Sequence, residues 1–471
     1  MKKLFYFILA ACTLHACSSD DNGGSSSSDY YELSTIPDKK AVFKAYPINA
    51  KQILGAGYDL AADYLSPEAI KAPVIDLDKV ANSDAVDIIR ARASSTTPKS
   101  YVGVNATAYL ADVAERIELE GTSTESPLFI GTFMKHKEFQ SDYDHSSLFS
   151  FASSEQVYTA ERWYFTPFYS SENKYKYSFL TQEFEDDVKS LAAEDIIQKY
   201  GTHLLMDVGI GGRFRGLYRT TIPAAPSTYE MENAIYLKTL DQIGKQGLFT
   251  GIIIGGGQEK ADICVGGQLV IEFFGGNTSL LSSHPSADAI NVWWSSFNED
   301  NYTLTDIIRN AIPIYEMIQD AAKKEQVKNA MKEYIANQKI TAVPTTQLFQ
   351  AWNGKRHTYY TSYLDCLADY STTYEGIVCS VYEQQKENTV PLYLYSNKRK
   401  QRISTEPLQE DGGWKLEKEL GYVYTLPVEG ATPLYEAENK NDYCYTTENK
   451  QEYGVEGSWK NAGIVCYVLP I

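Results

Sequence analysis

The sequence predicts an α+β fold over residues 36–340 and an all-β fold over residues 345–471. Three observations support this prediction. Segments of helical and of strand period occur side by side in the first region. The second region contains an internal repeat of short strand-like units. Between them, residues 341–346 contain Pro344 and read as a linker.

Hydrophobic spacing assigns individual elements in the first region. Met206–Tyr218 and Gln268–Phe274 have the composition of strands. Thr305–Lys339 reads as two helices, with Pro313 near the start or at a kink. A further helix is predicted over Asp186–Lys199, from five apolar residues at helical spacing: Val188, Leu191, Ala192, Ile196 and Ile197.

The repeat is visible in short matching strings. Pro391–Tyr393 recurs as Pro433–Tyr435, and Gly376–Cys379 recurs as Gly463–Cys466, with Gly421–Tyr424 between them. Units of about 42 residues cannot each bury a core, but three of them can do so around a pseudo-threefold axis. We therefore predict a three-repeat, β-trefoil-like domain over residues 345–471. Many such domains bind sugars; a structural appendage without a ligand is the alternative.

The N-terminus predicts a lipoprotein. Lys2 and Lys3 precede an apolar run that is too short to span a bilayer, and Leu14–Cys17 reads as a lipoprotein cleavage box. We expect residues 1–16 to be a signal peptide and Cys17 to be lipidated; ordinary secretion is the alternative. Residues 17–35, rich in serine, glycine and aspartate, read as a flexible tether.

The acidic stretch behind Cys17 resembles the surface-export signal of lipoproteins in the Bacteroidetes. We therefore expect an outer-membrane lipoprotein that is surface-exposed or released, in vesicles for example. No later segment offers the roughly 18 apolar residues of a transmembrane helix.

Charge and cysteine content limit the classes of partner. The formal net charge of −18 argues against wide nucleic-acid contact, because phosphates must meet Lys and Arg. In an exported chain the cluster of four C-terminal cysteines favours disulfides, with three pairings open. No CxxC spacing occurs and the six histidines are scattered, so we expect neither a metal site nor a cofactor. The candidate disulfide cysteines are Cys366, Cys379, Cys444 and Cys466.

One motif carries a family resemblance. Tyr200-Gly201-Thr202-His203 follows the predicted helix, and Gly211-Gly212 follows eight residues after His203. This arrangement resembles the signature of the membrane attack complex/perforin (MACPF) family, in which a helix runs into YGTH and then a strand ends in Gly-Gly. Leu204 stands where the family usually has an aromatic residue.

Three flanking stretches support the resemblance in the family's order. Leu54–Asp59 resembles a glycine-rich entry to the first long strand, and Gly275-Gly276 closes the strand that ends at Phe274. Trp293 or Trp294, followed by Ile307–Met317, resembles the tryptophan and Pro-Ile helix that complete the domain. The resemblance covers roughly residues 40–340, and the chain resembles bacterial MACPF lipoproteins of the Bacteroidales.

The resemblance implies a bent, twisted central antiparallel sheet flanked by two helical clusters. By order along the chain these clusters should lie near residues 103–150 and 220–262. Glycine pairs would let the sheet bend, and Tyr200 and His203 would hydrogen-bond the backbone at a helix-to-strand corner. We interpret His203 as a scaffold residue with satisfied hydrogen bonds, and we expect no enzymatic activity.

The helical clusters of this family unfurl into β-hairpins that many protomers pool into one barrel. Tyr101–Leu110 alternates polar and apolar residues as a membrane strand does, and continues with helical spacing to Ile117. An ordinary strand leading into a helix explains the same pattern. Gly251–Gly255 is apolar but does not alternate.

The leading functional hypothesis is a pore-forming toxin, antimicrobial or host-directed. Its expected partners are the lipid membrane of a target cell, further copies of itself in a ring, and a surface glycan or protein receptor bound by the C-terminal domain. The alternative is a non-lytic surface lipoprotein for adhesion or for capture of nutrients or glycans.

Overall fold

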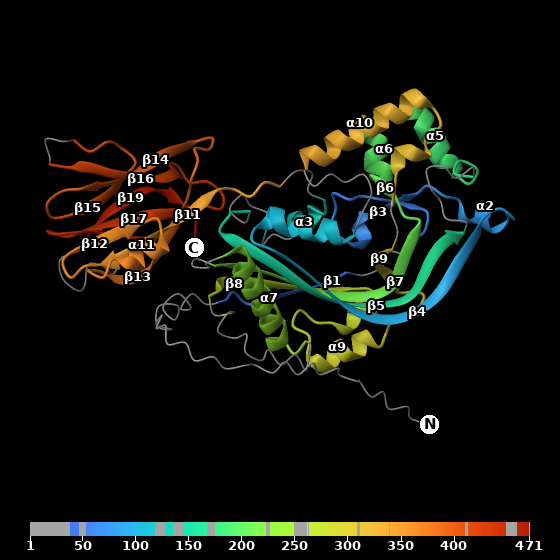
Figure 1. Cartoon of the computed structure of the whole chain (residues 1–471), viewed down its shortest axis with the longest axis horizontal. Coiled ribbons are helices and arrows are strands. Elements are labelled where there is room, and N and C mark those ends of the chain that lie inside the picture. The colour runs from blue at the N-terminus through green and yellow to red at the C-terminus, as the bar shows by residue number, and fades with distance from the viewer. Residues whose placement is uncertain are drawn as a thin grey trace.

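Four long antiparallel strands form the centre of the computed structural model (Figure 1). They are hydrogen-bonded in the order β8-β7-β5-β4, with bounds Val265–Phe274, Asp207–Thr221, Phe149–Thr166 and Asp87–Gly103. At one edge β1 (Val42–Tyr46) pairs in parallel with β8, and β9 (Thr303–Ile307) pairs with the first half of β7. The structure describes residues 38–46, 53–117, 128–135, 139, 145–166, 175–222, 227–248, 261, 263–308, 311–338, 340–409, 413–448 and 459–470.

The central sheet is strongly curved along its strands (Figure 1). Its register shifts between Arg92 and Ser95 of β4 and between Thr159 and Glu161 of β5. Such bulges add a residue to one strand and increase its local bend and twist. The expected bent, antiparallel sheet is therefore present, and both predicted strands, at 206–218 and 268–274, lie within it as β7 and β8.

Helices cover both faces of this sheet. On one face lie α3 (Ala106–Ile117) and the short α4 (Gly131–Met134), and on the other lie α7 (Thr228–Lys245) and α9 (Ala287–Trp294) (Figure 1). Successive side chains of β7 point to opposite faces of the sheet, as in any β-strand. Leu217 belongs to the large core on the α3 side, whereas Phe214 and Tyr218 pack with α7 and α9.

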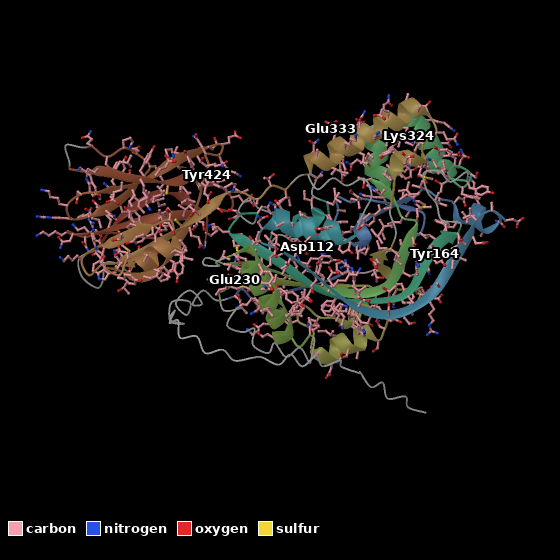
Figure 2. The ribbon with its side chains drawn as sticks, in the orientation of Figure 1. Asp112, Tyr164, Glu230, Lys324, Glu333 and Tyr424 are labelled. Carbon is pink, nitrogen blue, oxygen red and sulfur yellow. The ribbon has the colours of Figure 1, made fainter. Side chains whose placement is uncertain are left out.

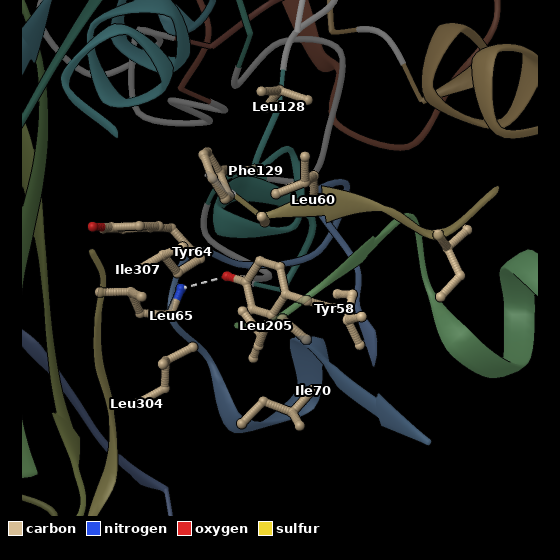
Figure 3. Close-up of a cluster of buried hydrophobic side chains, with 14 of the residues drawn as sticks. Tyr58, Leu60, Tyr64, Leu65, Ile70, Leu128, Phe129, Leu205, Leu304 and Ile307 are labelled. Atoms are coloured by element: carbon tan, nitrogen blue, oxygen red, sulfur yellow. Dashed lines mark hydrogen bonds between the residues drawn. The ribbon is translucent and has the colours of Figure 1, made fainter. Parts of the chain in front are cut away.

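A second, four-stranded sheet with the order β10-β6-β2-β3 lies beside the central one. Its strands are Ile312–Pro313, His203–Leu204, Ala56–Tyr58 and Ile70–Pro73. Helices α5 (Gln182–Ser190), α6 (Ala193–Tyr200) and α10 (Ala321–Asn337) lie above it (Figure 1). The core between the sheets includes Tyr58, whose hydroxyl accepts a hydrogen bond from the backbone N of Leu65 at 3.0 Å (Figure 3).

Two helix predictions were wrong in detail. The helix expected over 186–199 is two helices, because Leu191 and Ala192 are extended and separate α5 from α6. The stretch 305–339 contains strands β9 and β10, the 3₁₀ turn η5 (Ile314–Met317) and then a single helix, α10. The expected Pro-Ile helix is thus a short turn. Pairing with β7, distant in sequence, decides the conformation of residues 303–307.

Several shorter elements complete the structure. They are η2 (Pro67–Ala69), α2 (Leu77–Ala81), η4 (Thr278–Leu280) and α11 (Tyr363–Ala368). The expected linker at 341–346 is ordered: the backbone N of Ser147 donates to the carbonyl of Val343 at 2.8 Å, and strand β11 begins at Thr345.

The C-terminal region is all-β, as predicted, and its pairing order occurs three times. Leu348, Leu392 and Leu434 each precede a register shift in their strand, and all three lie in one buried core. The β-trefoil form of this region stays a prediction. The strands pair as β11 (Thr345–Trp352) with β12 (His357–Tyr360) and β13 (Thr373–Tyr382); β14 (Thr389–Ser396) with β15 (Gln401–Ser404) and β16 (Lys415–Tyr424); and β17 (Thr432–Glu438) with β18 (Tyr443–Thr446) and β19 (Lys460–Val468).

Trp293 offers a test of the packing under the sheet. It is fully buried, packs edge-on against Phe273 and Phe297, and donates from Nε1 to the carbonyl of Gly275 at 2.8 Å. We expect Trp293→Ala to lower the free energy of unfolding by about 3–5 kcal/mol, because it leaves a large cavity. Val292→Ala, at a 55% exposed position of the same helix, should change it by less than about 0.5 kcal/mol. Chemical denaturation measures both; equal losses would contradict the packing described.

Candidate functional site

The helix-to-strand corner at residues 200–203 is a place of very close backbone contact. Helix α6 ends at Tyr200, and Gly201 has φ +73°, a conformation that favours glycine. A Cβ on Gly201 would lie 2.6 Å from the carbonyl carbon of Tyr58, and one on Gly57 would lie 1.8 Å from the carbonyl oxygen of Tyr200. The two segments therefore touch only because both positions are glycine.

Thr202 is the residue that hydrogen-bonds the backbone across this corner. Its backbone N donates to the carbonyl of Tyr58 at 2.9 Å, and its Oγ1 accepts from the backbone N of Leu60 at 3.1 Å. The predicted role of Tyr200 was wrong, because its hydroxyl donates instead to the carboxylate of Asp187 on α5 at 2.6 Å. Tyr200 thus ties α6 to α5, and Thr202 ties the corner to β2.

His203 is buried at the same corner and is only half satisfied. Its Nδ1 lies 3.1 Å from Oγ1 of Thr202, whereas its Nε2 has no hydrogen-bond partner among the described residues. The predicted full satisfaction of this ring was therefore wrong. Burial lowers the pKa of His203 to about 4, which keeps the ring neutral at pH 7. A buried, neutral ring is compatible with the scaffold role predicted for His203, and that role stays a prediction.

The glycine pairs Gly211-Gly212 and Gly275-Gly276 lie at close contacts of the central sheet and at the turn after β8. A Cβ on Gly211 would lie 2.0 Å from the carbonyl oxygen of Tyr158, beside the bulge in β5, and one on Gly212 would lie 1.9 Å from the ring of Phe297. Gly275 and Gly276 have φ +79° and +70° as the chain leaves β8. Each pair therefore permits a contact or a turn that a side chain would block.

A buried charge cluster joins the sheet to the segment after β2. Arg213 donates to Oε2 of Glu155 at 3.2 Å. Arg215 donates to Oδ1 of Asp63 at 2.8 Å and also to Glu272. Burial by itself lowers the pKa of Arg215, but the facing carboxylates outweigh burial and hold that pKa well above its ordinary value. All five side chains are almost fully buried.

No sequence motif predicted this cluster. Arg213 and Arg215 are two residues apart on β7, so both side chains reach the same face of the sheet. Glu155 and Glu272 lie on the strands at either side. Charges at strand period inside an otherwise apolar strand were the available signal, but the carboxylate partners come from three other segments, which are distant in sequence.

The two helical clusters expected from the resemblance occur at the expected places. Residues 104–148, with α3 and α4, connect β4 to β5, and residues 222–264, with α7, connect β7 to β8. Gly103 pairs with Phe151, Phe149 with Thr221, and Thr221 with Val265. Four strand ends therefore lie in one row, and both helical segments depart from the same end of the sheet.

Helix α3 is held to the sheet by specific polar contacts. Tyr109 donates from its hydroxyl to Oγ of Ser153 on β5 at 2.8 Å, and the carboxylate of Asp112 accepts from the backbone N of Val102 on β4 at 2.9 Å. Figure 2 shows Asp112 on α3, against the upper face of the sheet. Tyr101–Gly103 is strand and Ala106–Ile117 is helix, so here the alternating segment is a strand that leads into a helix.

Helix α7 covers the opposite face mainly through apolar contact. Ile235 and Ile243 are buried against the sheet, and a Cβ on Gly216 of β7 would lie 2.6 Å from Cγ1 of Ile243. Figure 2 places Glu230 near the start of this helix. The apolar stretch Gly251–Gly255 lies outside the described residues.

The remaining predicted sites are placed as follows. Cys17, the signal peptide and the tether lie outside the described residues. Cys366, Cys379, Cys444 and Cys466 are buried free thiols, so disulfide pairing stays a prediction. Across the described ranges, no helix is long and apolar enough to cross a membrane, and no three His, Cys, Asp or Glu side chains are grouped to hold a metal ion.

The charge cluster predicts a large effect of removing its cation. We expect Arg215→Met to lower the free energy of unfolding by about 3–5 kcal/mol, because Asp63 and Glu272 would stay buried while losing their hydrogen bonds to the Arg215 guanidinium. The control Lys99→Met breaks the surface pair with Asp306 and should cost less than about 1 kcal/mol. Denaturant titration of both variants tests this; similar costs would mean that the cluster is hydrated.

His203 predicts a loss of stability in mild acid. The unfolded chain binds a proton at the ordinary pKa of 6.5, and the folded state resists protonation down to about pH 4. The free energy of unfolding should therefore fall by about 3 kcal/mol as the pH is lowered from 6.5 to 4, because only the unfolded chain binds the proton in this range. His203→Gln should flatten this slope in thermal melts, whereas His284→Gln, at an exposed position, should leave it unchanged. An unaltered slope in His203→Gln would overturn the assignment.

Comparison with known proteins gives matches to two family models. A model described as the MAC/Perforin domain matches residues 45–343, and a model described as a domain of unknown function (DUF5648) matches residues 403–469. Comparison with curated proteins gives no match.

Solved structures are similar at low sequence identity. GNIP1Aa from Chromobacterium piscinae is 13% identical, with 88% of this chain and 81% of that chain covered and a TM-score of 0.48. A putative cell invasion protein with a MAC/Perforin domain from Bacteroides thetaiotaomicron is also 13% identical, with 74% and 70% covered and a TM-score of 0.46. Pneumolysin is 10% identical, with 82% and 64% covered and a TM-score of 0.22. Because the MAC/Perforin model spans more than half of its length, this chain belongs to the MAC/perforin (MACPF) family.

Proposed function

We propose that this chain is a pore-forming protein that oligomerises on a target membrane and inserts β-hairpins into it. The observation that carries the proposal is the row of strand ends formed by Gly103, Phe149, Thr221 and Val265. Each helical segment joins two neighbouring antiparallel strands, so uncoiling it extends an existing hairpin in register. Both hairpins would emerge side by side from one end of the sheet.

Bilayer chemistry demands this type of rearrangement. A strand in hydrocarbon must have every backbone N–H and C=O group bonded to a neighbour, which only a closed barrel provides. A tilted membrane strand needs about 9–11 residues. Residues 104–148 and 222–264 are each long enough for two such strands and a turn. Several copies would have to pool their hairpins to close the barrel, so self-association is part of the proposal.

The C-terminal region supports a targeting role. Val265, the first residue of β8, packs with Phe349 and Tyr363, so this region is attached at the end of the sheet from which the helical segments depart. We propose that it is a three-repeat, β-trefoil-like domain that binds a surface glycan or protein receptor. A domain in this position would bring that end of the sheet to the target surface.

We also propose that the mature protein is an outer-membrane lipoprotein, anchored through Cys17 and surface-exposed or released in vesicles. The cleavage box Leu14–Cys17 and the acidic tether behind it support this location. The proposed activity is antimicrobial or host-directed and involves no catalysis. The alternative is a non-lytic surface lipoprotein that uses the same C-terminal domain for adhesion or for nutrient or glycan capture.

A disulfide lock on α7 tests the hairpin mechanism. We expect Gly216→Cys/Ile243→Cys to form a disulfide, because a Cβ at 216 lies 2.6 Å from Cγ1 of Ile243 and the Ile243 side chain is removed. The oxidised variant should release no dye from vesicles of phosphatidylethanolamine, phosphatidylglycerol and cardiolipin, or from live neighbouring strains that the unaltered chain permeabilises. Dithiothreitol should restore release, since the lock is then open.

The matched control is Gly216→Ser/Ile243→Ser, which changes the same positions without a covalent bond. It should release dye in the presence and absence of dithiothreitol. Release by the oxidised cysteine variant would show that α7 stays helical during permeabilisation. Absence of release by the unaltered chain on every target, with surface binding intact, would favour the non-lytic alternative.

A further inference from the structure

The end of the C-terminal domain farthest from the central sheet is made of three similar turns. Asn353–Arg356 joins β11 to β12, Asn397–Lys400 joins β14 to β15, and Asn439–Asp442 joins β17 to β18. In each turn the backbone N of the first residue donates to the carbonyl of the fourth, at 3.0–3.2 Å. The Oδ1 of each asparagine accepts from the backbone N two residues later, at 2.8–3.0 Å. Each turn is thus shaped by its own asparagine.

Hydrogen bonds link the three turns into a closed cycle. Arg356 donates to the carbonyl of Asn397 at 3.4 Å, and Lys400 donates to the carbonyl of Asn439 at 2.8 Å. Asp442 closes the cycle by accepting from the backbone N of His357 at 3.0 Å. The turns are therefore fixed relative to one another before any ligand arrives, which lowers the entropic cost of binding.

The surface between the turns is basic and hollow. A cleft of about 650 Å³ is lined by all three turns, including Lys355, Arg356, Lys398 and Arg399. Lys355, Lys398 and Arg399 are exposed, and no ion pair is formed by them within the described residues. Their positive charges are therefore available to a ligand.

Two carboxylates near this cleft are already engaged by cationic partners. Asp442 is buried and lies 2.6 Å from Nδ1 of His357, and Glu438 accepts from Lys400 at 3.0 Å. The whole chain has a formal net charge of −18, so this end has the opposite sign to the rest. Its position also matters: β11 leaves the sheet domain at Thr345 and reaches the first turn after Trp352, at the far side of the C-terminal domain (Figure 1).

Partly exposed aromatic rings stand next to the turns. Trp352 and Trp459 lie 5.0 and 6.0 Å from the ring of His357, and Trp414 lies 6.2 Å from Tyr443. The apolar C–H faces of a pyranose ring can pack on such rings, while cationic side chains hold its charged substituents. This combination favours a sugar over a bare ion.

We propose that this cleft, named here the basic tip, binds a glycan that carries phosphate groups on the target surface. The basic tip deepens the proposed targeting function and rests on it. Arginine presents a planar fork that matches two phosphate oxygens, and lysine adds a compact positive charge. The basic side chains of the cleft would bind the phosphate groups, and the aromatic rings at its rim would pack against the sugar rings.

The test measures binding of the full-length protein to a phosphorylated mannan and to the same mannan after phosphatase treatment. We expect dephosphorylation to weaken binding at least about tenfold, since charge-assisted hydrogen bonds are lost. Lys355→Gln/Lys398→Gln should weaken binding to the phosphorylated form by a similar factor. The control Lys189→Gln/Lys332→Gln makes the same change in net charge on exposed helices of the sheet domain and should leave binding unchanged.

Further arms identify the source of the phosphate. Tighter binding to phosphatidylglycerol vesicles, or to single-stranded DNA, than to the phosphorylated mannan would overturn the glycan assignment. Equal binding of the treated and untreated mannan would also overturn it, as would full binding by the Lys355→Gln/Lys398→Gln variant. Dye release is measured in parallel: mannan binding without release supports the basic tip while contradicting the pore, and release without mannan binding does the reverse.

Discussion

Antiparallel hydrogen bonding fixes one register across β4, β5, β7 and β8, and the rest of the structure depends on that register. Because adjacent strands are antiparallel, each helical segment leaves and re-enters the sheet at the same end. A segment inserted between two paired strands can become a longer hairpin without changing any pair that already exists. The sheet therefore works as a template, and the helices α3 and α7 are the parts that can change state.

The two faces of this template are held in different ways. The face under α3 carries the buried charges of Arg213 and Arg215, which bind carboxylates on three other segments. Buried pairs of this kind add little net stability, but breaking one costs much, so they define which surfaces meet. The face covered by α7 is apolar, and its hydrophobic contacts with the helix are non-directional. Detaching α7 thus breaks fewer specific bonds than separating the sheet from the segment around Asp63.

Acidic and basic residues are concentrated in different parts of the molecule. The sheet domain contributes much of the acidity, whereas the three turns at the far end of the C-terminal domain collect exposed lysine and arginine. The C-terminal domain is attached beside the first residue of β8, at the row of strand ends. Recognition at the basic tip and extension of the hairpins would therefore act on the same side of the molecule, which links the two proposals physically.

The sequence by itself determined the family, the two strands β7 and β8 and the places of the two helical segments. These depend on local requirements, such as glycine at 57, 201 and 211, where backbone contact leaves no room for a Cβ. Tertiary structure decided the rest. Residues 303–307 form a strand because β7 is available as a partner, and the hydrogen-bonding role expected of Tyr200 belongs to Thr202 because β2 lies beside it. The charge cluster and the basic tip join residues far apart in sequence, and no spacing along one chain records which distant side chains will meet.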